Sequence, residues 1–331
     1  MRYFLTGATG FIGGHVVRQL IADGHQVKAL VRSPSKAEGL ARLGADIYIG
    51  DILDKKSMRK AMEGTDGVFH LAAWYKVGAR DRSQAETINV EGTRNVLELM
   101  SELEIPRGLY TSTLAVFSDT RGRLVDETYR NEGPWLSEYD RTKWLAHYNV
   151  VLPLIEKGLP LVIVQPGVVY GPADPSPIGE TIRQYLRGRL PMVPRKTEFC
   201  WAHVADTARG HLLAMERGQV GESYIIAGPR HSFQEAFEVG ERITGIKAPR
   251  LHPSPTMLKV LSAIMGVIGT VLPLPDTYTA ESLRVVAGVT YLGDNTKARR
   301  ELGFQPRSLM EGLQETLVYE MKKLGLPLPR H

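Results

Sequence analysis

Short apolar runs rich in β-branched residues alternate with amphipathic stretches through the first two hundred residues of the chain. The stretches at residues 11–24 and 88–103 have the apolar spacing of helices, and the first ends at Gly24, a typical helix stop. This alternation is typical of a parallel sheet wrapped by helices. It predicts a doubly wound α/β fold of about seven strands, at residues 2–7, 26–32, 45–51, 67–73, 107–113, 161–167 and 222–228.

The pattern changes after residue 166. Prolines cluster within residues 165–177 and 190–196, and beyond residue 230 the sequence indicates helices and turns without regular alternation. Between these segments, within residues 204–229, the sequence again indicates a helix followed by a strand. We therefore expect two discontinuous parts, a sheet domain of residues 1–165 and 204–229, and a smaller, mostly helical lobe of residues 166–203 and 230–331.

Residues 260–275 form an uncharged apolar stretch that contains two glycines and two prolines. The stretch is shorter than the roughly 20 apolar residues that span a bilayer, so stable membrane insertion is not expected. The sequence favours a buried or dimer-facing helix here, with contact at a lipid surface as the alternative.

Composition narrows the class of protein. The 331 residues are 43% hydrophobic and 23% charged, which is ordinary for a folded protein. The net charge of +5 is spread along the chain, which argues against a nucleic-acid partner and favours an anionic small ligand. The single cysteine, Cys200, excludes an internal disulfide and a cysteine-based zinc site, and no metal is expected. Because the chain starts directly with a strand and a glycine turn, we expect a cytoplasmic protein.

The first strand runs directly into Gly7-Ala-Thr-Gly10-Phe-Ile-Gly13, which opens the first helix. Glycines at this spacing let the chain turn tightly and let a pyrophosphate approach the helix N-terminus, whose free N–H groups and dipole favour anions. The place of the pattern, between strand and helix, makes it a strong signal for a dinucleotide site. A tight turn without a ligand is the alternative. The predicted cofactor-binding residues of this turn are Gly7, Thr9, Gly10, Phe11, Ile12 and Gly13.

The end of the second strand bears on which dinucleotide binds. Where an NAD site usually has Asp or Glu for the ribose hydroxyls, this chain has Arg32, followed by Lys36. An acid would repel a 2′-phosphate, whereas Arg32 can bind one bidentately, so NADP(H) is favoured over NAD(H). A solvated loop arginine is the alternative. Asp51, after the third strand, is placed either to accept a hydrogen bond from an adenine amino group or to cap the next helix.

Tyr139 and Lys143 lie four residues apart in Tyr-Asp-Arg-Thr-Lys and so share one face of a predicted helix. Taken alone, the pair is equally compatible with an ordinary amphipathic helix. A carbonyl that is reduced by hydride needs a proton donor, and the reverse reaction needs a base. A free tyrosine has a pKa of about 10, and we expect the neighbouring ammonium and an oxidised nicotinamide to lower it.

Together these motifs resemble the extended short-chain dehydrogenases/reductases, the NAD-dependent epimerase/dehydratase superfamily, and especially their dihydroflavonol reductase-like branch. The resemblance covers nearly the whole chain and implies a Rossmann-type sheet. It also implies a homodimer formed through the helices around residues 85–103 and 137–157. It rests on motifs in the expected order: TGATGFIG, GDILD, HLAA, NVEGT, YTSTLAVF, YDRTK, QPGVVYGP, HVADTARGHLLAM and DNTKARRELGFQP.

The resemblance assigns roles to individual residues. It implies that Tyr139 is the catalytic acid or base, that Lys143 also holds the nicotinamide ribose, and that Thr113 hydrogen-bonds the substrate oxygen. Ser112 is the alternative if the register shifts by one residue. Each further residue implied along the cofactor has a structural alternative in close packing or turn formation. These residues are Ile52, Leu71, Ala72, Ala73, Asn89, Pro166, Gly167 and Val168.

Departures from the family pattern bear on the substrate. The sugar-nucleotide branch usually has an Arg four residues before the histidine of the HVAD stretch, where this chain has Phe199, and a later Arg-x-Gly-Asp stretch, where it reads RVVAGVTYLGDNTK. Both departures argue against a nucleoside-diphosphate sugar, although Arg195 and Lys196 could replace the missing cations. The candidate substrate residues are aromatic, and core packing is equally compatible with each of them: Trp74, Tyr75, Tyr170, Phe199 and Trp201.

The sequence therefore predicts an NAD(P)-dependent oxidoreductase that transfers hydride between nicotinamide and a ketone, aldehyde or secondary alcohol of a small, non-nucleotide substrate. One alternative is a sugar epimerase or dehydratase that retains its cofactor. The other is a non-catalytic, dinucleotide-sensing regulator, which is disfavoured because such relatives typically lack the Tyr and Lys pair.

Overall fold

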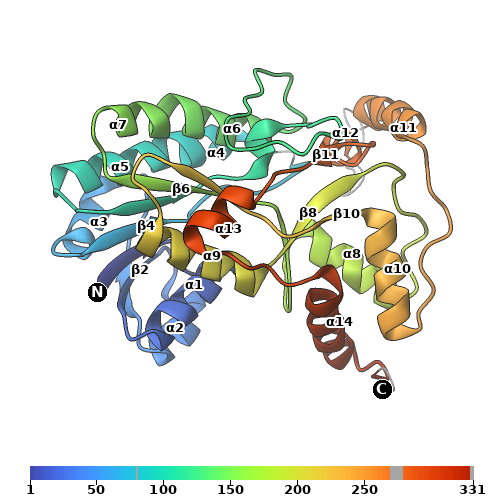
Figure 1. The fold of residues 1–331 in the computed structure, drawn as a ribbon, viewed down its shortest axis with the longest axis horizontal. Helices are drawn as coiled ribbons and strands as arrows, with labels where there is room; N and C mark the ends of the chain where they lie inside the picture. Colours follow the sequence, from blue (N-terminus) through green and yellow to red (C-terminus); the bar gives the residue numbers. More distant parts are fainter. Residues whose placement is uncertain (80, 269–278, 329–331) are drawn as a thin grey trace.

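A computed structural model describes residues 1–79, 81–268 and 279–328, and Figure 1 shows its ribbon. A seven-stranded sheet has the order β3-β2-β1-β4-β5-β6-β9, and all of its strand pairs are parallel. The predicted doubly wound sheet is therefore confirmed. Its strands are β1 (Arg2–Thr6), β2 (Gln26–Val31), β3 (Asp46–Ile49), β4 (Gly67–His70), β5 (Gly108–Thr111), β6 (Leu161–Pro166) and β9 (Ser223–Ile226).

Helices cover both faces of this sheet (Figure 1). One face is covered by α1 (Phe11–Ala22), α2 (Glu38–Arg42), α9 (Val204–Arg217) and α13 (Thr296–Leu302). The other is covered by α3 (Lys55–Met62), α5 (Gly92–Glu102), α6 (Glu138–Ala146) and α7 (Leu152–Glu156). Shorter elements are η1 (Pro34–Lys36), α4 (Ser83–Glu86), η3 (Leu114–Phe117) and two π-helical turns, η2 (Thr87–Glu91) and η4 (His147–Val151).

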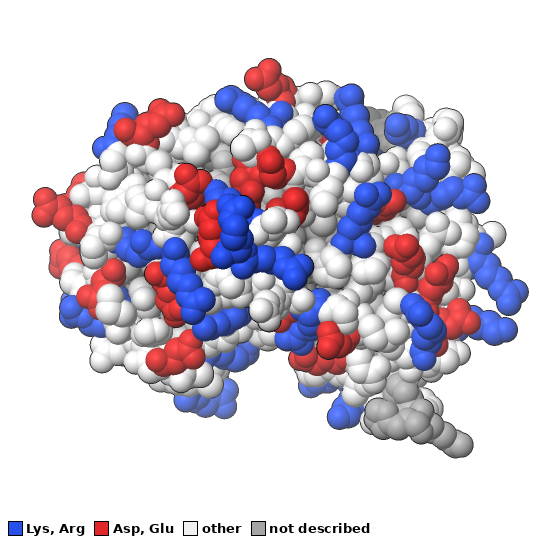
Figure 2. All heavy atoms as spheres, viewed as in Figure 1, with Lys and Arg blue, Asp and Glu red and all other residues white. Residues whose placement is uncertain are grey.

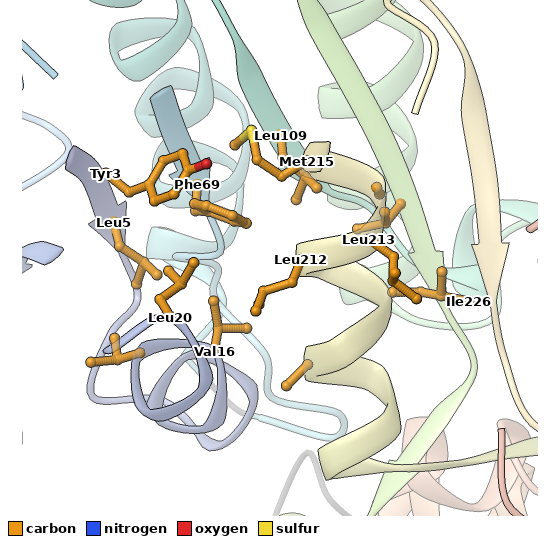
Figure 3. Close-up of a cluster of buried hydrophobic side chains, with 14 of the residues drawn as sticks. Tyr3, Leu5, Val16, Leu20, Phe69, Leu109, Leu212, Leu213, Met215 and Ile226 are labelled. Carbon is orange, nitrogen blue, oxygen red and sulfur yellow. The ribbon is translucent and has the colours of Figure 1, made fainter. Parts of the chain in front are cut away.

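Apolar side chains fill the space between the sheet and the helices. Val16 and Leu20 of α1 and Leu212 of α9 lie in one buried cluster with Leu5 and Phe69 from neighbouring strands (Figure 3). Full burial of one such side chain stabilises the fold by about 1.5–3 kcal/mol. Because both faces are covered, the central strands are nearly continuous apolar runs, which is why the sequence pattern revealed them.

The second part of the molecule contains a small sheet centred on β8, which pairs in parallel with β7 and β11 and antiparallel with β10. Capping boxes start two of its helices, with Ser232 and Glu235 at α10 and Ser308 and Glu311 at α14. The elements are β7 (Val168–Tyr170), α8 (Pro177–Leu186), β8 (Glu198–His203), β10 (Arg230–Ser232), α10 (Phe233–Thr244), α11 (Pro255–Ile268), α12 (Ala280–Arg284), β11 (Thr290–Tyr291) and α14 (Leu309–Leu324).

Helix α13 lies within the range expected to form the lobe, yet it packs elsewhere. Ala298, Leu302 and Phe304 belong to the buried cluster under the large sheet, together with residues of α1 and α9. The chain therefore returns once more to the sheet domain before α14, a crossing that the proline and helix pattern did not indicate.

The apolar segment 260–275 lies only partly within the described residues, because residues 269–275 fall outside them. Helix α11 buries Leu258 and Ser262, but Val260 and Ile264 are at least half exposed. The described part is therefore not a fully buried helix, and the dimer-facing and lipid-contact alternatives both stay open. Among the helices that the structure describes, none has both the length and the apolarity to cross a membrane.

Candidate active site

The glycine turn brings β1, α1 and the end of β4 into close contact. Gly7 has a φ of +74°, and a Cβ there would lie 2.7 Å from the backbone nitrogen of Ala72. A Cβ at Gly13 would lie 2.1 Å from the carbonyl oxygen of Gly7. Both positions accept only glycine without a shift of backbone, so the turn has the tight form that the motif predicts.

The N-terminus of α1 differs from those of α6 and α8. Its N-cap residue, Gly10, provides no side-chain acceptor, and the first turn holds no acid. By contrast, Ser137 and Ser176 cap α6 and α8 with their side chains. An uncapped helix end with a positive dipole fits the pyrophosphate of a dinucleotide, with Thr9, Phe11 and Ile12 in the same turn.

The residues expected around the adenosine end lie at the ends of β2 and β3. Arg32 directly follows β2 and is exposed, as is Lys36 at the end of η1. Asp51 accepts a hydrogen bond at Oδ1 from the Leu53 N–H at 3.0 Å, whereas the cap of α3 is the Asp54 side chain. The helix-cap role is therefore taken by another residue. Ile52, also expected along the cofactor, is buried in the core beside α5.

Lys143 is buried between α6 and the end of β5. Its Nζ donates to the Tyr110 hydroxyl at 2.9 Å and to the Thr111 carbonyl oxygen at 2.8 Å. Burial lowers the pKa of Lys143 to about 7. The ammonium is thus held in place by β5. Tyr110 is a site residue that the sequence reasoning missed, because it lies within the apolar run of β5.

Tyr139 points towards the same region from one turn earlier on α6. Burial raises its pKa, the neighbouring Tyr75 raises it further, and the Thr113 hydroxyl lowers it. The expected lowering by Lys143 is not what the structure shows, because loss of solvent dominates and the ammonium is engaged by Tyr110. The ring of Tyr75 meets that of Tyr139 edge-on, with centroids 4.8 Å apart.

Thr113 and Ser112 face opposite ways, as successive residues in extended backbone do. Thr113 interacts with Tyr139, and its Oγ1 accepts a hydrogen bond from the Ala115 N–H at 3.2 Å. The Ser112 Oγ is instead buried and bonded to His147 Nδ1 at 2.8 Å. The structure therefore brings Thr113, Tyr139 and Lys143 together at the carboxyl edge of the parallel sheet, where ligands of open α/β sheets bind.

The loop after β4 is held by Asn89. Its Oδ1 accepts from the Trp74 N–H at 2.7 Å, and its Nδ2 donates to the Trp74 carbonyl at 3.1 Å and to Thr142 Oγ1 at 2.9 Å. Asn89 is thus fully engaged in fixing the loop against α6. Three residues of this loop were expected along the cofactor: Leu71 and Ala72 are partly buried, and Ala73 is exposed.

The Pro-Gly turn after β6 has a packing role. A Cβ at Gly167 would lie 2.3 Å from the carbonyl oxygen of Cys200, so glycine permits the close approach of β8. Pro166 ends β6 and is buried, while Val168 begins β7 and is partly buried against the lobe core.

The five aromatic candidates separate into two groups. Trp74 packs beside Tyr139, and Tyr75 is half exposed against it. The other three are buried in the lobe core, where a cavity of about 10 Å³ beside Trp201 has room for roughly one water. The structure therefore places these three in packing positions: Tyr170, Phe199 and Trp201.

The fold and this arrangement define a dinucleotide-binding α/β enzyme. Residues 3–227 match the model of the NAD dependent epimerase/dehydratase family, which is more than half of the chain, so the chain belongs to this family. It is 33% identical over 327 residues to a putative dihydroflavonol 4-reductase from Synechocystis sp., covering 95% of this chain and 93% of the relative. It is 29% identical over 325 residues to sterol demethylase protein B of Methylococcus capsulatus, covering 96% and 98%.

Solved structures show the same architecture over the whole chain. The crystal structure of gox2253 has a TM-score of 0.84 at 31% identity and covers 98% of both chains. That of PA4631, a nucleoside-diphosphate-sugar epimerase from Pseudomonas aeruginosa, has a TM-score of 0.79 at 26% identity and also covers 98% of both. The chain is an NAD(P)-dependent oxidoreductase of the extended short-chain dehydrogenase/reductase family, as the sequence predicted.

Proposed function

We propose that this enzyme is an NADP(H)-preferring reductase of a ketone or aldehyde on an apolar, ring-bearing substrate. The observation that carries the proposal is the convergence of Thr113, Tyr139 and Lys143 beside the loop of Trp74 and Tyr75. When bound along the glycine turn, the cofactor supplies the hydride or takes it up.

Two hydroxyl groups serve the substrate oxygen. Because burial raises the pKa of Tyr139, its phenol is protonated at neutral pH and acts as the proton donor to the carbonyl oxygen. The Thr113 oxygen accepts a hydrogen bond from the Ala115 N–H, so the Thr113 O–H can donate to the carbonyl oxygen of the substrate. At neutral pH the phenol therefore carries the proton that reduction of the carbonyl requires.

Lys143 has a positioning part in this proposal. Its ammonium is fixed to the end of β5 by Tyr110 and Thr111, and Thr113 follows two residues after that strand ends. From there it would hold a ribose hydroxyl of the cofactor, as the family resemblance implies. Its pKa near 7 leaves part of the population uncharged at neutral pH, so cofactor binding is expected to raise the charged fraction.

The substrate class follows from the side chains beside Tyr139. Trp74 and Tyr75 offer flat apolar surface next to the proton donor, which suits a ring system. Phe199, where the sugar-nucleotide branch has an Arg, stacks on Tyr291 in the lobe core and offers no charge. The names of two relatives refer to ring compounds, a dihydroflavonol and a sterol, which supports the same class.

The preference for NADP(H) rests on the segment after β2. No acid stands between Arg32 and Lys36, and both cations are exposed where the adenosine ribose would lie. The Ser33 and Ser35 hydroxyls, 3.0 Å apart, lie between them and can donate to a phosphate. These four side chains provide the charge and the donors that a 2′-phosphate requires.

The assembly and the location are part of the proposal. We place a homodimer contact on α5 and on the helices from α6 to α7, which lie next to one another on one side of the sheet (Figure 1). A cytoplasmic location is supported by Cys200, a buried cysteine that forms no disulfide.

A sugar epimerase remains the second candidate, because the PA4631 structure carries that name. The purified enzyme should be incubated with NADPH and a cyclic ketone of steroid or dihydroflavonol type, and with UDP-glucose. We expect consumption of NADPH, followed by its near-ultraviolet absorbance, with the cyclic ketone only. Tightly held NAD that survives gel filtration, with interconversion of the sugar nucleotide and no net cofactor change, would contradict the proposal.

A further inference from the structure

Helix α11 presents a row of apolar side chains to solvent. Met257, Val260, Ile264 and Val267 follow one another at helical spacing and lie on one face. They are 54%, 56%, 50% and 71% exposed. The opposite face is the one that packs on the protein, where the Ser262 Oγ donates to the Ala280 carbonyl oxygen at 2.7 Å. Isolated apolar residues on a surface are ordinary, whereas a continuous row indicates a contact with something else.

Basic residues accompany this row. Met192 and Leu251, both exposed, form a bridge just before α11, and the Arg195 N–H donates to the Pro253 carbonyl at 3.1 Å. The segments joined in this way, residues 187–197 and 247–268, contain no Asp or Glu. They contain seven exposed cations, Arg187, Arg189, Arg195, Lys196, Lys247, Arg250 and Lys259. In Figure 2, blue and white atoms dominate the corner where Figure 1 draws α11.

We propose that this docking face, the α11 row with Met192, Leu251 and the seven cations, binds an anionic lipid surface. The helix, about 21 Å long at 1.5 Å per residue, would lie flat in the headgroup region with its apolar row inward. The cations would contact lipid phosphates, and each one near the surface strengthens binding about fivefold. This binding is peripheral and does not depend on the proposed reaction.

Charge decides between a lipid surface and a second copy of this chain. A symmetric dimer contact places each residue near its own copy or near the same patch of the partner. Seven cations without an acid in the two segments would then face seven more, and like charges at an interface oppose association. An anionic surface complements all of them at once.

The test is sedimentation of the full-length protein with vesicles of phosphatidylcholine alone or mixed with phosphatidylglycerol. We expect binding to the anionic vesicles at least tenfold stronger than to the neutral ones, and weaker binding at high salt. The double substitution Val260→Glu and Ile264→Glu should lower binding to anionic vesicles at least tenfold. The double substitution Arg250→Gln and Lys259→Gln should lower it about 25-fold, from two lost charges.

Matched controls lie on other surfaces. Val220→Glu changes another half-exposed valine in the same way, and Lys322→Gln with Lys323→Gln removes two cations from α14. Neither should change vesicle binding, and all variants should keep the thermal midpoint of the parent. Failure of the parent to bind anionic vesicles, or equal losses in the controls, would overturn the proposal. The proposal would also be overturned if the parent were a dimer that does not bind vesicles and the Val260→Glu and Ile264→Glu variant were a monomer.

Discussion

Lys143 illustrates how a single residue reports on its surroundings. Its ammonium donates to Tyr110 and to the Thr111 carbonyl, yet burial still lowers its pKa to about 7, far below the 10.5 of an exposed lysine. Two hydrogen bonds to neutral groups therefore do not compensate for the loss of water around the charge. This residue couples protonation to folding.

The sign of that coupling can be worked out. Between pH 7 and 10.5 the unfolded chain keeps the Lys143 proton while the folded chain has released it, so stability gains about 1.4 kcal/mol per pH unit from this residue. The variant Lys143→Met has no titrating group at this position, so it lacks this increase in the free energy of unfolding with pH. We predict that urea unfolding at pH 7.5 and 9 shows the parent becoming about 2 kcal/mol more stable relative to the variant. A constant difference between the two proteins would contradict a lowered pKa.

Arg32 is the residue on which the cofactor preference depends. Arg32→Ala should weaken NADPH binding about 10-fold to 100-fold, because an ion pair with a phosphate is lost, and should leave NADH binding nearly unchanged. Fluorescence titration of both cofactors measures this. Arg209→Ala, an exposed arginine on α9, is the control. Equal effects of Arg32→Ala on NADH and NADPH would remove the basis for the preference.

At the scale of elements, the loop after β4 depends on one buried amide. Asn89 lies in the π-helical turn before α5 and makes three hydrogen bonds, two to the backbone of Trp74 and one to Thr142 on α6. π-Helical turns are frequent at functional sites because they redirect side chains within a helix. Here the turn directs Asn89 towards the loop that carries Trp74 and Tyr75.

Asn89→Ala should therefore destabilise the protein and loosen this loop. We predict a loss of about 2–3 kcal/mol in the free energy of unfolding, because buried backbone groups of Trp74 lose their partners. Asn95→Ala, which removes one hydrogen bond to the Ile52 carbonyl, should lose only about 1 kcal/mol. Urea unfolding of both variants provides the comparison. Equal losses would mean that Asn89 has no special part in holding the loop.

Some elements could be predicted from the sequence and others could not. The strands were predictable because strands buried on both faces appear in the sequence as continuous apolar runs. The glycine turn was predictable from the spacing of its glycines between a strand and a helix. The position of Phe199 and Trp201 was not, because an aromatic residue has the same pattern in a core as in a substrate pocket. The sequence could not decide between a buried and a dimer-facing α11, because apolar residues are found on both its buried and its exposed face. Tyr110 was hidden among the apolar residues of β5.

At the scale of the whole molecule, the start of α6 joins the two parts. The Tyr291 hydroxyl donates to the Asp140 carboxylate at 2.9 Å, and Glu281 of α12 accepts the Glu138 N–H at 3.1 Å. Glu281 is buried and also pairs with Arg82 at 2.6 Å. Burial raises the pKa of Asp140 to about 6. The helix that carries Tyr139 is thus positioned by residues from the lobe, which links the placement of the lobe to the position of Tyr139.

Removing this link should affect stability and substrate binding together. We predict that Glu281→Ala lowers the free energy of unfolding by about 2 kcal/mol, mainly because the N–H at the start of α6 loses its acceptor. Glu281→Gln keeps an acceptor, and since Arg82 is half exposed, it should lose less than about 1 kcal/mol. Urea unfolding and the KM for substrate measure both effects. Equal losses in the two variants would show that the charge, not the acceptor, matters.

The central claim is that Tyr139 donates a proton during hydride transfer. The most direct measurement is turnover of NADPH and a cyclic ketone by Tyr139→Phe, with the Kd for NADPH measured alongside. We expect kcat to fall at least a hundredfold and the Kd for NADPH to change little. Tyr75→Phe, which keeps the ring contact with Tyr139, should retain turnover. Full activity of Tyr139→Phe would show that Tyr139 is not the proton donor.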